Sequence, residues 1–190
     1  MNEILFKIGR VIESVARYDN NALDEISSEG IFFMPELAFV FSCGKAIMLE
    51  RADVFSGFEV TWKREENHGN GGPTDLVFEL KKNGGLVQYI AIEFKLRNTW
   101  NAYLKDIDKL LTLKNNNPEI YTVAFCALVD TFTRQYPDDG RVGKIEAYDA
   151  AKAKVTSLLE PKPYFPTKQT RYPIEPVSCV VGFWSIDLPL

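Results

Sequence analysis

Two runs of alternating apolar residues meet at a glycine-rich loop within residues 73–96, which read PTDLVFELKKNGGLVQYIAIEFKL. Successive side chains of a β-strand point to opposite faces, so each run would present one apolar face. The loop Lys82-Asn-Gly-Gly85 is typical of a turn that joins two antiparallel strands. The segment therefore predicts a β-hairpin. Its apolar face would carry Leu76, Phe78 and Leu80, then Ile90, Ile92, Phe94 and Leu96.

The polar face of this hairpin brings two acids together. If the loop holds three residues, flanked by Lys82 and Leu86, the register of the two strands is fixed. Counting back along both strands places Asp75 directly across from Glu93, with Lys95 two residues further along the same face. Like charges across a ladder destabilise it, so we expect a cation to offset them. Mg²⁺ fits, because it typically takes one or two carboxylates and completes its shell with water and phosphate oxygens.

These residue types at this spacing fit metal-assisted hydrolysis of a phosphodiester bond. Asp75 and Glu93 would hold Mg²⁺, with Mn²⁺ as a substitute, and Lys95 would contact the attacking water or the charge that develops on phosphorus. The alternative is a solvated sheet face with an ordinary Glu–Lys surface pair. Glu36, in the first turn of an apolar helix after Pro35, is a further candidate ligand, because a poorly solvated carboxylate needs a partner. An acid at a helix N-terminus would also be favourable without a metal.

The flanking sequence predicts further helices and strands around the hairpin. Apolar residues at three- and four-residue steps predict helices over residues 4–15, 35–47, 100–111 and 142–159, with a short helical piece around Leu23 and Ile26. Strands are predicted over residues 57–65, 75–80, 86–96, 121–129 and 177–188. The helix over 35–47 is apolar on most sides, so we expect it to be buried. This order predicts an α/β fold: a single domain over residues 1–190 with a mixed central sheet flanked by helices.

Two other segments are less informative about chemistry. Residues 161–176 hold five of the ten prolines, which predicts an extended connection. The basic and aromatic side chains of this segment would suit a nucleic-acid strand, but a strap packed on the fold is the simpler interpretation. His68, the single histidine, lies in a Gly/Asn loop and is interpreted as a solvated loop residue rather than a ligand or base.

The composition is that of a packed globular protein. With 190 residues, 46% hydrophobic and 25% charged, the chain is not a disordered tail, a collagen-like fibre or a disulfide-stapled miniprotein. Its three cysteines lie far apart in apolar runs, which indicates reduced core thiols. The N-terminus lacks the pattern of a secretory signal, and no apolar run reaches the length of a membrane helix. We therefore expect a cytoplasmic protein with no membrane association.

The formal net charge of −4 excludes a broadly basic nucleic-acid coat. The charge is unevenly distributed, however. Residues 81–114 hold 7 basic and 3 acidic side chains, and residues 134–171 hold 8 and 5. The first of these basic segments contains the proposed catalytic strand, so the charge pattern permits a local, metal-bridged phosphate site.

Pro73-Thr-Asp75, then seventeen residues, then Glu93-Phe-Lys95, after a helix with Glu36 and before a helix–strand unit, resemble the PD-(D/E)xK nuclease superfamily, which has the restriction-endonuclease-like fold. The resemblance implies an α-βββ-α-β core over about residues 31–130, with 131–190 as an addition. It also implies metal ligands at Asp75 and Glu93 and a catalytic Lys95. Glu36 would match the helix glutamate of the branch with RecB-like nucleases and Holliday-junction resolvases.

Two features of the sequence depart from a simple motif match. Thr74 separates the proline from the aspartate, and the Glu-x-Lys pattern occurs three times, at residues 79–81, 93–95 and 160–162. Only the middle copy lies inside a strong strand with an upstream acid in register. The run over residues 105–110 on the next helix is also similar to what many members of the superfamily carry.

The resemblance implies a Mg²⁺-dependent nuclease that acts on DNA. The alternatives are a catalytically inactive binding or regulatory subunit of the same fold, working with a partner protein in a defence or repair system, and a protein-interaction module of the immunity type. A homodimer is also compatible with the sequence.

Overall fold

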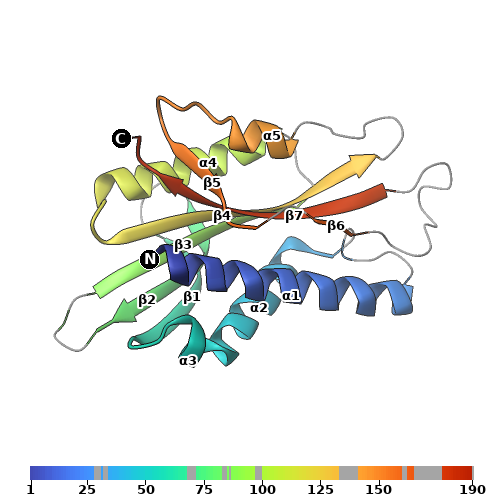
Figure 1. The fold of residues 1–190 in the computed structure, drawn as a ribbon, viewed down its shortest axis with the longest axis horizontal. Helices are drawn as coiled ribbons and strands as arrows, with labels where there is room; N and C mark the ends of the chain where they lie inside the picture. Colours follow the sequence, from blue (N-terminus) through green and yellow to red (C-terminus); the bar gives the residue numbers. More distant parts are fainter. Residues whose placement is uncertain are drawn as a thin grey trace.

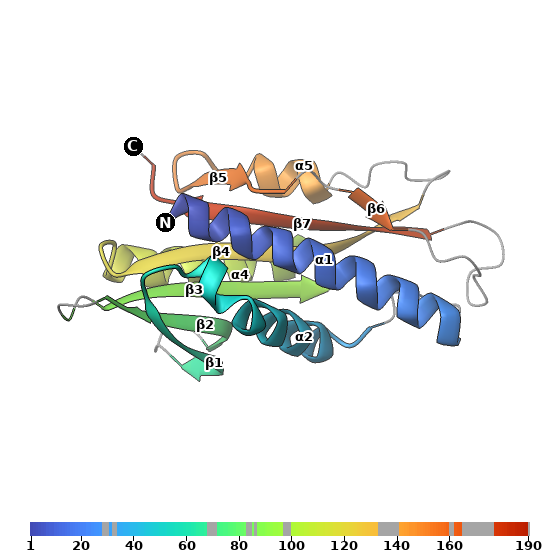
Figure 2. The ribbon, with the colours of Figure 1, turned by 60° about the horizontal axis from the view of Figure 1, so that its bottom comes forward.

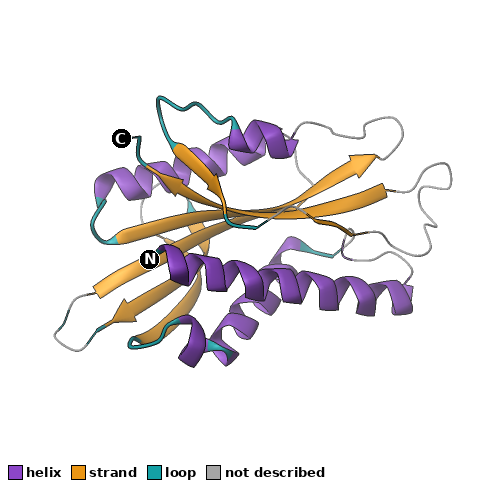
Figure 3. Cartoon of the chain, viewed as in Figure 1, coloured by secondary structure: helices purple, strands orange, loops and turns teal. Residues whose placement is uncertain are grey.

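The computed structural model contains both helices and strands, as expected of an α/β protein (Figure 3). The structure describes residues 1–27, 31, 34–67, 72–82, 85, 87–96, 100–132, 141–159, 162–164 and 177–189. The helices are α1 (Asn2–Ser27), α2 (Glu36–Leu49), α3 (Arg51–Val54), α4 (Trp100–Asn116) and α5 (Arg141–Glu146). The strands are β1 (Glu59–Asn67), β2 (Pro73–Lys81), β3 (Val87–Leu96), β4 (Tyr121–Phe132), β5 (Lys154–Ser157), β6 (Lys162–Tyr164) and β7 (Val177–Asp187).

All these strands belong to one mixed sheet in the order β1-β2-β3-β4-β7-β5, with β6 also paired to β7 (Figure 1). The first three strands form an antiparallel meander. Strand β4 is parallel to β3, and α4 makes the crossover between them. The predicted mixed sheet with flanking helices is confirmed, and the order α2, β1–β3, α4, β4 is the α-βββ-α-β order expected for the core.

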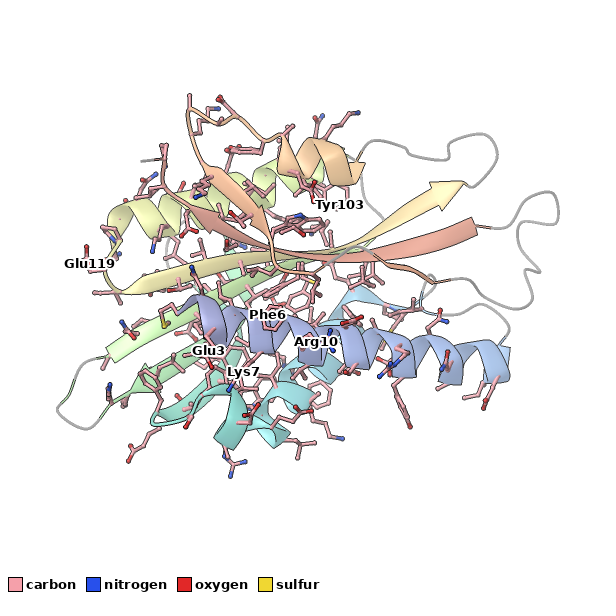
Figure 4. The ribbon with its side chains drawn as sticks, in the orientation of Figure 1. Glu3, Phe6, Lys7, Arg10, Tyr103 and Glu119 are labelled. Atoms are coloured by element: carbon pink, nitrogen blue, oxygen red, sulfur yellow. The ribbon has the colours of Figure 1, made fainter. Side chains whose placement is uncertain are left out.

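The sheet separates two hydrophobic cores. Helices α1 and α2 cover one face, and α4 and α5 cover the other (Figure 2). The apolar face of the hairpin, including Phe78, Ile92 and Phe94, packs in the first core. Tyr103, labelled in Figure 4, points from α4 into the second core. Its ring meets that of Phe125 on β4 edge-to-face, with ring centroids 6.0 Å apart. Burial on both faces explains why the β4 sequence is almost continuously apolar.

The register of the hairpin is the one predicted. Its ladder runs from Lys81↔Val87 to Leu76↔Ile92. Gly85 adopts a positive φ of 91°, and its amide donates to the carbonyl of Lys82 at 3.0 Å. That conformation is easy for glycine and strained for other residues, so the loop chemistry and the strand alternation specify the same register.

Three local predictions differ from the structure. The piece around Leu23 and Ile26 is helical as predicted, but it is the last part of a continuous α1 and not a separate helix. Asn20 lies within this helix, and its side chain accepts a hydrogen bond from the amide of Ile31. Helix α2 is not buried on most sides, since Leu37 and Leu49 are 53% and 73% exposed. Its outward face remains solvated because α2 covers the sheet from one side only.

The predicted helix over residues 142–159 is also wrong. Helix α5 ends at Glu146, and residues 154–157 form β5 on the edge of β7. Asp149 holds a turn beyond the end of α5: its side chain accepts a hydrogen bond from the amide of Ala151, and its carbonyl accepts one from the amide of Lys152. Such local bonds compete with the helix, and β7 offers an open edge to the segment that follows.

Several predictions fall on parts of the chain outside the described residues. They concern His68, most of residues 161–176 and the side chain of Cys179. Cys43 and Cys126 are buried free thiols, as expected for core cysteines. Within the described part of the chain, no helix combines the length and apolarity needed to cross a membrane.

Candidate functional site

Asp75 and Glu93 lie at the end of the hairpin remote from its loop, on the face that α4 covers. The observed ladder ends at Leu76↔Ile92, and the next position in register places Asp75 opposite Glu93. Residues directly opposite in an antiparallel pair have Cβ atoms about 4.5–5.5 Å apart. The structure therefore brings together the two acids that the sequence pattern placed on adjacent strands.

Each of these acids has a partner within the chain. Oδ2 of Asp75 accepts a hydrogen bond from the backbone amide of Phe94 at 2.7 Å, which ties β2 to β3. Glu93 is only 2% exposed, and its Oε1 lies 2.6 Å from Nζ of Lys109 on α4. Because a buried charge is costly without a partner, Lys109 is what permits an acid at this depth.

Lys95 is held by two other carboxylates. Its Nζ lies 3.1 Å from Oδ2 of Asp106 on α4 and 3.5 Å from Oε1 of Glu36 on α2. Glu36 also accepts a hydrogen bond from the amide of Leu96 at 2.9 Å. As the first residue of α2, Glu36 thus joins that helix to the end of β3, and its carboxylate belongs to the same cluster as Lys95.

Helix α4 therefore contacts β3 through two ion pairs of opposite polarity. Asp106 and Lys109, one turn apart on α4, face Lys95 and Glu93 respectively. Residues three apart on a helix share one side, as do residues two apart on a strand. The two pairs fix the position of α4 along β3 and leave no one of the four charges buried alone.

Burial raises the pKa of both acids, and neighbouring charges modify the shift. Burial raises the pKa of Glu93 to about 8, and the charge of Asp75 adds to the shift while Lys109 opposes it. Burial likewise raises the pKa of Asp75 to about 6, against the effect of the hydrogen bond from Phe94. Burial alone would lower the pKa of Lys95, but the carboxylates of Asp106 and Glu36 outweigh it, and the pKa lies above its ordinary value.

The two strand acids are the side chains suited to a metal ion. Their carboxylate oxygens are the donors that Mg²⁺ prefers, and the raised pKa of each shows that the internal lysines do not fully compensate their charge. Among the described residues, no group of three or more His, Cys, Asp or Glu side chains is arranged to hold a metal. The arrangement fits an ion that takes two carboxylates and completes its shell with water or phosphate, while the predicted third ligand, Glu36, contacts Lys95 and the amide of Leu96.

The sequence interpretation missed Asp106 and Lys109 as members of the cluster. A signal for them exists in the helical periodicity. Tyr103, Ile107 and Leu110 form the buried stripe of α4, and Asp106 lies within that stripe while Lys109 borders it. A charged residue inside an apolar stripe needs a partner on the surface that it faces, which here is the strand with Glu93.

Comparisons with known proteins found no relative of this chain. No family model matches the chain, no curated protein is significantly similar to it, and no solved structure matches it. The function is therefore inferred from the residues of the chain and their geometry.

Proposed function

We propose that the protein is a metal-dependent nuclease that hydrolyses phosphodiester bonds in DNA, as its resemblance to the PD-(D/E)xK superfamily implies. The observation that carries the proposal is the position of Asp75 opposite Glu93, with Lys95 on the same face. Both acids have raised pKa values. A cluster of desolvated carboxylates with incomplete compensation is characteristic of functional sites.

In this proposal each residue has a defined task. Asp75 and Glu93 would hold Mg²⁺ or Mn²⁺, which would supply activation of the attacking water and stabilisation of charge on phosphate oxygens. Lys95 remains protonated and presents a fixed positive charge to the phosphate or the attacking water. Glu36 and Asp106 orient the Lys95 ammonium group through their contacts with it.

The direct test is cleavage of DNA. Single-stranded, linear duplex, plasmid and branched substrates are incubated with the protein and Mg²⁺ or Mn²⁺. We expect cleavage that EDTA abolishes, and a loss of at least about a hundredfold in rate for D75N, E93Q and K95M. Activity that survives EDTA and D75N unchanged would contradict the mechanism.

The same hairpin supplies matched controls. Glu79 and Lys81 have the Glu-x-Lys spacing of the proposed site, and their side chains form an ion pair at 2.8 Å. They lie near the loop end of the hairpin, remote from Asp75. We expect E79Q and K81M to cleave DNA at the rate of the wild type, because these residues are outside the site and a partly exposed ion pair contributes little to stability.

A second candidate function is a catalytically inactive subunit of the same fold. The observation in its favour is that Asp75, Glu93 and Glu36 each already have a partner within the chain. Such a protein would bind DNA or a partner protein without cleaving it. Gel-shift and calorimetric Mn²⁺ titrations separate the candidates: DNA binding without metal binding or cleavage would favour the inactive subunit.

We also propose that the protein acts in the cytoplasm, where the buried free thiols of Cys43 and Cys126 would stay reduced. A homodimer, or a complex with a partner protein in a defence or repair system, remains part of the proposal. Light scattering of the purified chain, with and without DNA, tests the homodimer.

A further inference from the structure

Lys109 lies where oxygen atoms from two strands converge. Its ammonium nitrogen is 2.6 Å from Oε1 of Glu93 on β3 and also donates to the backbone carbonyl of Pro73 on β2. The side chains of Lys109 and Glu93 are 11% and 3% exposed. A carboxylate and a backbone carbonyl at one point are the kind of oxygen ligands that bind divalent cations in proteins. The ammonium group of Lys109 thus lies at a position whose oxygen atoms would also suit a metal ion.

The other lysine of the cluster has a different environment. The ammonium group of Lys95 contacts the carboxylates of Glu36 and Asp106, from α2 and α4. Lys109 instead contacts one of the two acids proposed to hold the metal, together with the backbone beside the other acid. Each lysine therefore contacts a different part of the cluster. Only Lys109 contacts an oxygen of an acid that is proposed to hold the metal.

A charge count shows what this arrangement leaves for a metal. When all groups are ionised, four carboxylates (Glu36, Asp75, Glu93 and Asp106) face two ammonium groups (Lys95 and Lys109). One divalent cation would neutralise the remaining two negative charges. A second would leave an excess of positive charge in a largely buried site, which is unfavourable. In the wild type that excess would be two positive charges. Without Lys109 three negative charges would remain, so a second cation would leave an excess of only one positive charge, and it would find a vacant position among the ligand oxygens.

We propose that the ammonium group of Lys109 fills a cation position of this site, so that α4 supplies a positive charge that a second metal ion would otherwise provide. The inference rests on the proposed function, because it takes Asp75 and Glu93 to hold a divalent cation. It assigns Lys109 as a positioning residue that fixes Glu93 and sets the number of metal ions.

The test counts the Mn²⁺ ions bound by the wild type and by K109M. Electron paramagnetic resonance follows free Mn²⁺ during titration at millimolar concentrations, so the readout does not depend on activity. Methionine removes the charge and keeps an unbranched stem. We expect K109M to bind one ion more than the wild type. K109R retains the charge and is expected to bind the same number of ions as the wild type.

Two further variants make the count decisive. K109Q keeps an amide that can donate to Glu93 or to the carbonyl of Pro73, so it provides the count if circular dichroism shows that K109M does not fold. K95M removes a positive charge from the same cluster without vacating the position among the ligand oxygens. We expect K95M to gain no ion, whereas a general electrostatic effect would give it the same gain as K109M.

The possible outcomes separate this inference from the proposed function. An equal count in the wild type and in the neutral variants at Lys109 overturns the inference, and the proposed function stands if that count is one or more. An equal gain in K95M overturns the inference as well. An ion bound by the neutral variant but none by the wild type supports the inference and contradicts metal dependence. No binding by any protein overturns both.

Discussion

At the scale of single residues, Glu93 has the most unusual environment of the proposed site residues. It is an acid with 2% exposure, its partner is Lys109, and burial raises its pKa to about 8. The unfolded chain would hold this group near the ordinary value for glutamate, so the folded state binds the proton more tightly. An ionised Glu93 therefore costs stability in the metal-free protein, because Lys109 compensates its charge only in part.

This cost predicts that the metal-free protein loses stability as the pH rises. Between the ordinary pKa of a glutamate and a pKa of about 8 the folded state holds more protons than the unfolded state. The free energy of unfolding then falls with increasing pH. Asp75, with a pKa raised to about 6, adds to the decline at lower pH. Urea unfolding in EDTA at pH 5 and pH 8.5 measures it.

The variant E93Q provides the control for this prediction. Glutamine cannot ionise, so we expect E93Q to lose about 1–3 kcal/mol less stability than the wild type between the two pH values. E79Q, whose acid forms the exposed pair with Lys81 and has a pKa below the ordinary value, should not reduce the loss. Identical pH dependence in the wild type and E93Q would show that Glu93 is not a buried acid whose charge is incompletely compensated.

At the scale of elements, the contact of α2 with β1 depends on a glycine. A Cβ atom at Gly44 would lie 2.2 Å from the ring of Trp62, which is closer than Cβ atoms come to other heavy atoms in proteins. We expect G44A to lower the free energy of unfolding by about 1–3 kcal/mol, because the ring must move to make room. Since α2 begins with Glu36, the variant should also disturb the contacts of that residue with Lys95 and Leu96.

Another helical glycine is the matched control. Gly143 of α5 would meet no atom within 4 Å if it carried a Cβ, and it has no positive φ. We expect G143A to be neutral or slightly stabilising, because alanine favours a helix. Equal unfolding midpoints of G44A and the wild type would contradict close packing of α2 on β1.

Elements also show where sequence reasoning succeeds and fails. The hairpin register was predictable because strand alternation and the loop residues indicate the same pairing. The helix over residues 142–159 was not, because its apolar spacing is compatible with a helix while Asp149 and the open edge of β7 decide otherwise. Helix propensity over a short stretch of sequence does not show that β7, which follows later in the chain, offers its edge to residues 154–157.

Contacts between elements that are distant in the sequence also limited the prediction of the site. Asp75, Glu93 and Lys95 were identified because one hairpin carries all three, and Glu36 because an acid begins an apolar helix. The contacts of Lys109 and Asp106 with β3 depend on how α4 docks on the sheet. Spacing along the chain does not determine that docking, although the buried stripe of α4 restricts which side chains face the sheet.

At the scale of the whole molecule, metal binding should be linked to folding. A ligand that binds only the folded state stabilises it, by about 2.7 kcal/mol at a concentration one hundred times its Kd. Because protons compete with the metal for Asp75 and Glu93, we expect Mn²⁺ to raise the melting temperature more at pH 8 than at pH 5.5.

Thermal unfolding with and without Mn²⁺ at both pH values measures this linkage. The double variant D75N/E93Q is expected to show no shift at either pH, and E79Q to shift as the wild type does. A Mn²⁺ shift that is equal in D75N/E93Q and the wild type would place the binding elsewhere on the molecule.

The measurement that tests the central claim most directly is a crystal structure of the protein with Mn²⁺, examined by anomalous scattering. We predict an anomalous peak between Asp75 and Glu93, with carboxylate oxygens of both residues at about 2.0–2.2 Å from the ion. The ammonium group of Lys95 should lie beside it. A map with no peak between the two carboxylates, or with a peak bound by other residues, would contradict the account.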